Sequence, residues 1–130
     1  MTAPTATAPY TASTIDGLPQ LWDGLAKLVR EGLGITAFGV QIMDLPPNYT
    51  TDAHDETETG QEELYIALRG HGAVIIDDAG VLLDGEHVVV VPPQTARTLT
   101  SGPDGLRVLC VGGTPGQPYS APEWTEGVLD

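Results

Sequence analysis

One histidine and two glutamates in the first half of the chain have the types and spacing of a chemical site. His54 and Glu56 are one residue apart, and Glu63 follows at the start of an apolar run. Side chains two positions apart on an extended strand share a face, so His54 and Glu56 would lie together and the next strand could bring Glu63 opposite them. One imidazole and two carboxylates can hold a divalent metal, accept a proton or pair with a buried cation.

The strand that begins at Glu63 determines which way this glutamate points. Alternation places Glu63 with Tyr65 and Ala67 on one face, and three aliphatic side chains on the other. Either the face of Glu63 or the opposite face, with Leu64, Ile66 and Leu68, lines the interior of the fold. The acidic residues around it are instead expected on a solvated loop that serves solubility: Asp52, Asp55, Glu58 and Glu62.

A helical pattern precedes this site. Apolar residues between positions 18 and 33 recur every three or four residues, as one face of an amphipathic helix requires. Asp16 is the expected N-cap, Pro19 lies in the first turn, and Gly34 supplies a stop signal. We therefore predict one N-terminal α-helix over about residues 18–33, with Trp22 packed in the core.

After Gly34 the pattern changes to short β-rich runs between clusters of Gly, Pro, Asp and Asn. About eight such runs predict an antiparallel sandwich or barrel. Tight hairpin turns are expected at residues 69–72 and 77–80. The predicted strands cover residues 36–45, 50–54, 63–69, 72–76, 81–83, 87–91, 97–100 and 106–112.

The length of the chain fits one domain. At 130 residues it can enclose a single hydrophobic core and is too short for two. Residues 1–14, rich in Thr, Ala and Pro, predict a flexible tail, which leaves residues 15–130 for the domain. Residues 113–130 predict an irregular C-terminal tail, in which Tyr119 and Trp124 anchor the chain to the domain or to a second subunit.

Charge and motifs exclude several classes of function. The formal net charge of −13 repels polyanions, so neither nucleic acid nor an anionic membrane surface is expected as a partner. The chain has no apolar run of membrane-spanning length, no signal-peptide pattern and a single cysteine, Cys110; a soluble, cytoplasmic protein is expected. No phosphate-binding loop, nucleophile motif or zinc-protease motif is present.

Two stretches resemble the motifs of the cupin superfamily, particularly its small single-domain members. The first cupin motif has two histidines one residue apart, then a glutamate, then a glycine seven residues later. Glu63 and Gly70 match its end, His54 matches the first histidine, and Glu56 stands at the second. The second motif is similar to residues 84–97, where Arg97 replaces the motif histidine.

The resemblance covers about residues 36–112 and implies a fold, a cofactor and a partner. The implied fold is all-β, a double-stranded β-helix or jelly-roll barrel of the RmlC-like type, here with one N-terminal α-helix. Many cupins are homodimers, and many hold iron, manganese, nickel, zinc or copper. Transferred by position, the divalent metal would be held by His54, Glu56 and Glu63, whereas Arg97 cannot be a ligand because its guanidinium offers only donors.

Arg97 opens a second interpretation of the same residues. Its guanidinium could pair with Glu63 or Glu56 through a bidentate fork and replace the charge of the metal, or it could bind an anionic group of a ligand. The leading hypothesis is therefore a cupin-type protein that binds a small molecule in its barrel, with Arg97, Tyr65 and Glu63 as ligand-binding residues. The alternatives are a metal-dependent oxygenase or isomerase and a non-catalytic structural or regulatory module.

Overall fold

The computed structural model describes residues 8–125 of the chain. Residues 1–7 of the predicted N-terminal tail and residues 126–130 of the predicted C-terminal tail lie outside this range. The elements are β1 (Gln20–Leu21), β2 (Ala26–Lys27), α1 (Val29–Leu33), β3 (Gly39–Leu45), β4 (Glu62–Ile76), β5 (Ala79–Leu83), β6 (Val88–Val91), β7 (Thr98–Gly113) and the 3₁₀ helix η1 (Glu123–Thr125).

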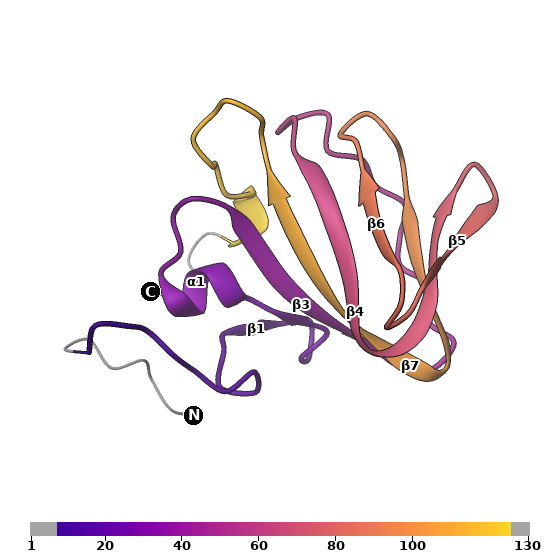
Figure 1. Ribbon diagram of the computed structural model, residues 1–130, viewed down its shortest axis with the longest axis horizontal. Helices are drawn as coiled ribbons and strands as arrows, with labels where there is room; N and C mark the ends of the chain where they lie inside the picture. Colours follow the sequence, from indigo (N-terminus) through magenta and orange to yellow (C-terminus); the bar gives the residue numbers. More distant parts are fainter. Residues whose placement is uncertain (1–7, 126–130) are drawn as a thin grey trace.

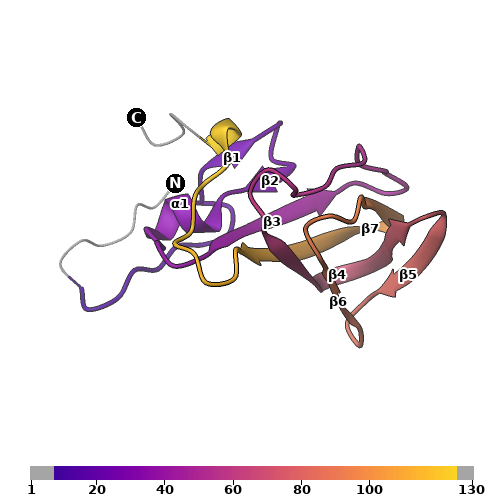
Figure 2. The ribbon, with the colours of Figure 1, turned by 90° about the horizontal axis from the view of Figure 1, so that it is seen from above.

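One strongly curled antiparallel sheet forms most of the molecule (Figure 1). Its strand order is β1-β2-β3-β7-β4-β5, and β6 pairs with the free side of the first half of β4. Figure 2 shows β1, β2 and α1 gathered near one end of the sheet. The predicted all-β class is confirmed, because antiparallel strands dominate and helix is confined to short segments.

The two longest strands, β4 and β7, run side by side and bend together. Two predicted strands, 63–69 and 72–76, are one continuous strand β4, so the hairpin predicted at residues 69–72 is wrong. The register of β4 against β7 shifts between Gly70 and Gly72. A Cβ at Gly70 would overlap the carbonyl oxygen of Gly105, and one at Gly72 would overlap that of Thr100. These glycines therefore permit a close crossing of two backbones, and the chain bends without reversing.

The hairpin predicted at residues 77–80 is confirmed. Ile76 of β4 pairs with Ala79 of β5, and the two connecting residues, Asp77 and Asp78, both have positive φ. A two-residue turn of this kind matches the right-handed twist of the flanking strands, and aspartate tolerates the left-handed conformation better than most residues.

The predicted helix over residues 18–33 is wrong for most of its length. The segment forms the β1–β2 ribbon, and only five residues, Val29–Leu33, are helical. Trp22, Asp23 and Gly24 have consecutive φ values of 55°, 54° and 86°, which form a left-handed turn that no right-handed helix can include. The apolar spacing is met instead by a ribbon and one helical turn, which bury Leu18, Ala26 and Leu28.

The two faces of the sheet differ in burial. The inner face carries Met43, Tyr65, Val108 and Cys110, all buried in the core. The outer face carries aliphatic side chains that remain in part exposed, including Val88 and Val90 at 66% and 60%. Among residues 8–125, no helix has the length and apolar character that a membrane crossing requires. The predicted homodimer stays a prediction.

Candidate functional site

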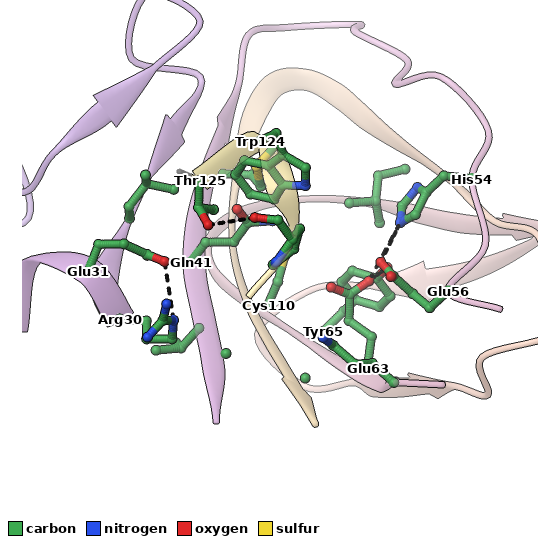
Figure 3. Close-up of a pocket in the computed structure, with 18 of the residues that line it drawn as sticks. Arg30, Glu31, Gln41, His54, Glu56, Glu63, Tyr65, Cys110, Trp124 and Thr125 are labelled. Atoms are coloured by element: carbon green, nitrogen blue, oxygen red, sulfur yellow. Dashed lines mark hydrogen bonds and ion pairs between the residues drawn. The ribbon is translucent and has the colours of Figure 1, made fainter. Parts of the chain in front are cut away.

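A cavity of about 250 Å³ lies against the inner face of the sheet. Its wall comes from β3, β4 and β7, from the loop before β4, and from α1 and the C-terminal tail. Figure 3 shows two polar groups at separate ends, with Cys110 and Trp124 between them. His54, Glu56, Glu63 and Tyr65 form one end, which we call the acidic end, whereas Arg30, Glu31 and Gln41 form the other, the arginine end.

Main-chain hydrogen bonds position the loop that carries His54 and Glu56. The backbone N–H of His54 donates to the carbonyl of Arg97 (3.1 Å), and the N–H of Arg97 donates back to His54 (2.9 Å). The N–H of Glu56 donates to the carbonyl of Pro93 (2.9 Å). Both residues are therefore held against the segment that precedes β7, and the predicted strand over residues 50–54 is reduced to isolated bridges.

The structure brings the three predicted metal-ligand residues together. His54 Nε2 lies 3.6 Å from Glu56 Oε1 and 3.8 Å from Glu63 Oε1. One ligand atom from each residue falls within 4.8 Å of the others. The predicted association of His54, Glu56 and Glu63 is therefore confirmed as a geometric fact, while metal binding stays a prediction.

Glu63 lies on the inner face of β4 together with Tyr65, and their shared face is the one that alternation predicted. Tyr65 is 1% exposed and donates a short hydrogen bond from its hydroxyl to Glu63 Oε1. Burial, followed by the adjacent Glu63 carboxylate, raises the pKa of Tyr65 above its usual range. The phenol therefore stays protonated at ordinary pH and acts as a hydrogen-bond donor that orients Glu63.

Arg97 lies behind Glu63 and does not contribute to the cavity wall formed by the described residues. Its side chain is fully buried, and Nη1 lies 3.9 Å from Glu63 Oε1. The predicted pairing with Glu63 is present as this ion pair but not as a bidentate fork, because Nη2 donates to the carbonyls of Pro92 (3.0 Å) and Val91 (3.4 Å). Nε and Nη1 have no hydrogen-bond partner among residues 8–125. The role of Arg97 toward a ligand stays a prediction.

The proximity of these groups shifts their pKa values. Interaction with the Glu63 carboxylate raises the pKa of His54 above its usual range, although burial alone would lower it. Burial and the neighbouring Glu63 raise the pKa of Glu56. A protonated His54 together with Arg97 balances the two carboxylates, so the cluster can be neutral without any further ion.

The arginine end of the cavity was missed by the sequence analysis. Arg30 and Glu31 project from α1, with Nε 3.2 Å from Glu31 Oε2, and Gln41 projects from the inner face of β3. The guanidinium of Arg30 lies over the ring of Tyr119, 5.1 Å from its centroid. No motif joins these residues, and the aromatic anchors of the tail were the only signal that this end is enclosed.

Both tryptophans of the chain line the cavity. Trp22 lies in the turn between β1 and β2 and is 56% exposed, so its predicted place in the core is wrong. Its ring packs on Trp124 of η1 with centroids 5.4 Å apart. The predicted return of the C-terminal tail to the domain is confirmed for its described part, since Tyr119 and Trp124 both reach the cavity wall.

Cys110 also lines the cavity, as the register partner of Tyr65. It is 3% exposed, and burial, with Glu63 as a second cause, raises the pKa of its thiol. The neutral thiol therefore contributes an apolar surface between the two ends, as predicted for a buried lone cysteine.

The cluster at the acidic end fits a divalent cation by atom type and spacing. One imidazole nitrogen and two carboxylate oxygens suit a hard or borderline ion, and each lies within reach of a shared centre. Arg97 is the neighbour whose charge opposes this use, because it already lies beside Glu63. The residues that would hold such an ion are His54, Glu56 and Glu63.

Comparison with known proteins supports the fold. No protein-family model matches the chain, and no curated protein matches it. Among solved structures, the chain is similar to a cupin protein from Bacteroides fragilis, with 21% identity, a TM-score of 0.67 and 95% of this chain and 99% of that chain covered.

Two further structures extend this similarity. A Cupin 2 conserved barrel domain protein from Salinispora arenicola has 17% identity and a TM-score of 0.67, covering 84% of this chain and 92% of that one. A predicted oxalate decarboxylase from Thermotoga maritima has 20% identity and a TM-score of 0.55, covering 67% and 76%. With the curled sheet and the cavity on its inner face, these likenesses establish that the chain has the cupin fold.

Proposed function

We propose that the protein binds a small polar molecule in the cavity of its curled sheet. The observation that carries this proposal is a charge cluster on the cavity wall in which His54 lies 3.6 Å from Glu56 and 3.8 Å from Glu63. Glu56 accepts one hydrogen bond, from Thr59, and Glu63 accepts one, from Tyr65, so further acceptor positions remain on both carboxylates. A pocket with a mostly apolar wall and a few convergent polar groups is the usual form of a ligand site. His54 and Glu56 would contact the ligand directly, while Tyr65 and Arg97 hold Glu63 in position.

The chemistry of the acidic end suits a ligand that carries hydroxyl groups or another hydrogen-bond donor. Carboxylates accept hydrogen bonds, and His54, whose pKa is raised, can donate one or transfer a proton near neutral pH. The cavity volume of about 250 Å³ lies below the range of roughly 300–1,000 Å³ of pockets for drug-sized ligands, which favours a small metabolite.

A thermal-shift screen of small organic acids, polyols and amines tests this function. Compounds that bind the folded protein should raise its melting temperature, and His54→Ala should abolish the shift. His71→Ala is the matched control, because His71 is an exposed histidine outside the cavity wall. The proposal fails if no compound stabilises the native protein, or if His54→Ala responds as the native protein does.

A metal-dependent function is the second candidate, favoured by the spacing of His54, Glu56 and Glu63. A bound divalent ion would supply Lewis-acid chemistry at the acidic end of the cavity. Isothermal titration of chelator-treated protein with Mn²⁺ and with Zn²⁺ tests this candidate. Saturable binding that His54→Ala removes would support it, whereas heats no larger than those of His54→Ala would eliminate it.

A further inference from the structure

The arginine end of the cavity contains two polar atoms without a hydrogen-bond partner among residues 8–125. Arg30 and Gln41 line the cavity, and the buried atoms Arg30 Nε and Gln41 Oε1 make no hydrogen bond among residues 8–125. The dashed line at Arg30 in Figure 3 marks its ion pair with Glu31. Nearly all buried polar groups of folded proteins are paired with protein or ordered water. A donor and an acceptor without protein partners in one cavity wall are therefore sites where a bound molecule can form hydrogen bonds.

The Arg30 side chain is held in place while this donor stays free. Its Nη1 donates to the carbonyl of Ile35 (3.2 Å), and its guanidinium lies over the Tyr119 ring at 5.1 Å. Glu31 Oε2 is 3.2 Å from Nε but outside hydrogen-bond geometry. A guanidinium fixed in this way loses little conformational entropy when a ligand oxygen binds to it.

We propose that the arginine end is a subsite for the carboxylate of a small hydroxycarboxylic acid, an inference that rests on the binding function proposed above. Arg30 donates to the carboxylate, and Gln41 Oε1 accepts from a hydroxyl group of the same molecule. The remaining hydroxyl groups reach the acidic end, where Glu56 and Glu63 accept their hydrogen bonds. The molecule thus spans the cavity, with its carboxylate at the arginine end and its hydroxyl groups at the acidic end.

The charges of the wall favour a carboxylate over a phosphate. Arg30 is the one arginine that lines the cavity among the described residues, and it already forms an ion pair with the Glu31 carboxylate beside it. A phosphate group carries about −1.5 to −2 charges at neutral pH and needs more than one such partner. A carboxylate carries a single negative charge, so it adds less uncompensated charge to this end than a phosphate would.

Intrinsic fluorescence gives a direct test, because both tryptophans, Trp22 and Trp124, line the cavity. Glycerate, threonate and gluconate are titrated, each beside the polyol in which a hydroxymethyl group replaces the carboxylate. At least one acid should change the emission saturably and bind roughly 10- to 100-fold more tightly than its matched polyol, as expected for a charge-assisted hydrogen bond. Arg30→Gln should remove this preference.

Two further variants keep the result interpretable. Arg69→Gln is the matched control, since Arg69 is exposed and outside this cavity, and it should keep the preference. Gln41→Leu tests the subsite without removing a charge and should weaken the acid by roughly tenfold. Unfolding curves establish that each variant folds.

The subsite is overturned if acids and polyols bind equally, if Arg30→Gln keeps the preference, or if no acid of the series binds. Failure of the subsite is distinguishable from failure of the binding function. If compounds of another class bind and His54→Ala abolishes their binding, the cavity binds ligands but its arginine end is not a carboxylate subsite. If nothing binds, both proposals fail.

Discussion

Two clusters of charged side chains occupy opposite faces of the sheet, and they are built in different ways. On the outer face, Asp44 accepts hydrogen bonds from Arg107 Nε (2.7 Å) and Nη2 (3.0 Å), and its Oδ2 lies 2.7 Å from Lys27 Nζ. On the inner face, the closest approach between His54, Glu56, Glu63 and Arg97 is 3.6 Å. The charged groups of the outer cluster pair with one another at hydrogen-bond distance. In the inner cluster, Arg97 Nε and Nη1 have no hydrogen-bond partner among residues 8–125.

The pKa shifts express the same difference. Burial alone would raise the pKa of Asp44, but the hydrogen bonds from Arg107 and Lys27 outweigh it and lower the value. Burial also raises the pKa of Glu56, and there the neighbouring partners are too weak to reverse it. We therefore expect the outer cluster to stabilise the fold and the inner cluster to bind another molecule.

The largest expected effect comes from opening the outer cluster. Asp44→Asn leaves Lys27, which is 6% exposed, without a counter-charge and should lower the free energy of unfolding by about 2–3 kcal/mol. Urea unfolding measures this loss, with Asp52→Asn, an exposed aspartate, as the control. A loss below about 0.5 kcal/mol would show that the outer cluster does not stabilise the fold.

Protonation of Asp44 at low pH should break the ion pairs of the outer cluster without a mutation. The folded pKa of Asp44 lies below its unfolded value, so its contribution is present above pH 3.8 and is lost as the pH falls through the folded pKa. Native protein should lose stability more steeply below this pH than Asp44→Asn does. Melting temperatures of both proteins across the acid range provide the measurement, and parallel curves would contradict the expectation.

Glu63→Gln applies the same isosteric change to the inner cluster and should cost less. Glu63 lies 3.9 Å from Arg97 Nη1, against 2.7 Å between Asp44 and Lys27, so less ion-pair energy is lost. The amide carbonyl that replaces the carboxylate can also accept from Tyr65, and we expect a loss of about 1 kcal/mol. Urea unfolding beside Asp44→Asn decides the comparison. Equal losses would mean that the inner cluster is also a stabilising ion-pair network.

His54 should give the smallest effect on stability. Its folded pKa is raised, so its contribution is present below pH 6.5, the unfolded value, and is lost as the pH rises through the folded pKa. The loss should stay below about 1 kcal/mol, because the side chain is 45% exposed. NMR titration of chelator-treated protein should give a His54 pKa above 6.5 that Glu63→Gln lowers; an unchanged value would remove Glu63 as the cause.

The inner cluster was largely predictable because it depends on local periodicity. Glu63 and Tyr65 share a face of β4 by simple alternation, and a motif resemblance aligned His54 and Arg97 with them. The outer cluster was not predicted. Asp44 and Arg107 are directly opposed in the β3–β7 register, which joins positions 63 residues apart, and nothing local in either strand specifies that register.

The failure to predict the arginine end and the wrong prediction of a helix over residues 18–33 have one cause, which differs from that of the outer cluster. Three consecutive left-handed residues, Trp22 to Gly24, redirect a segment whose apolar spacing suits a helix equally well. Periodicity reports which residues are buried but not the sign of φ. The turn places Trp22 in the cavity wall, and α1, which follows it, carries Arg30. Because a helix was predicted where this turn lies, the arginine end of the cavity was not predicted.

The paired main-chain hydrogen bonds between His54 and Arg97 have an evolutionary consequence. They fix the backbone at both positions without using either side chain. Position 97 can therefore exchange one side chain for another while the path of the chain stays constant. A lineage could replace the buried cation by a metal-coordinating imidazole in a single mutational step, and the same scaffold would pass from one chemistry to another.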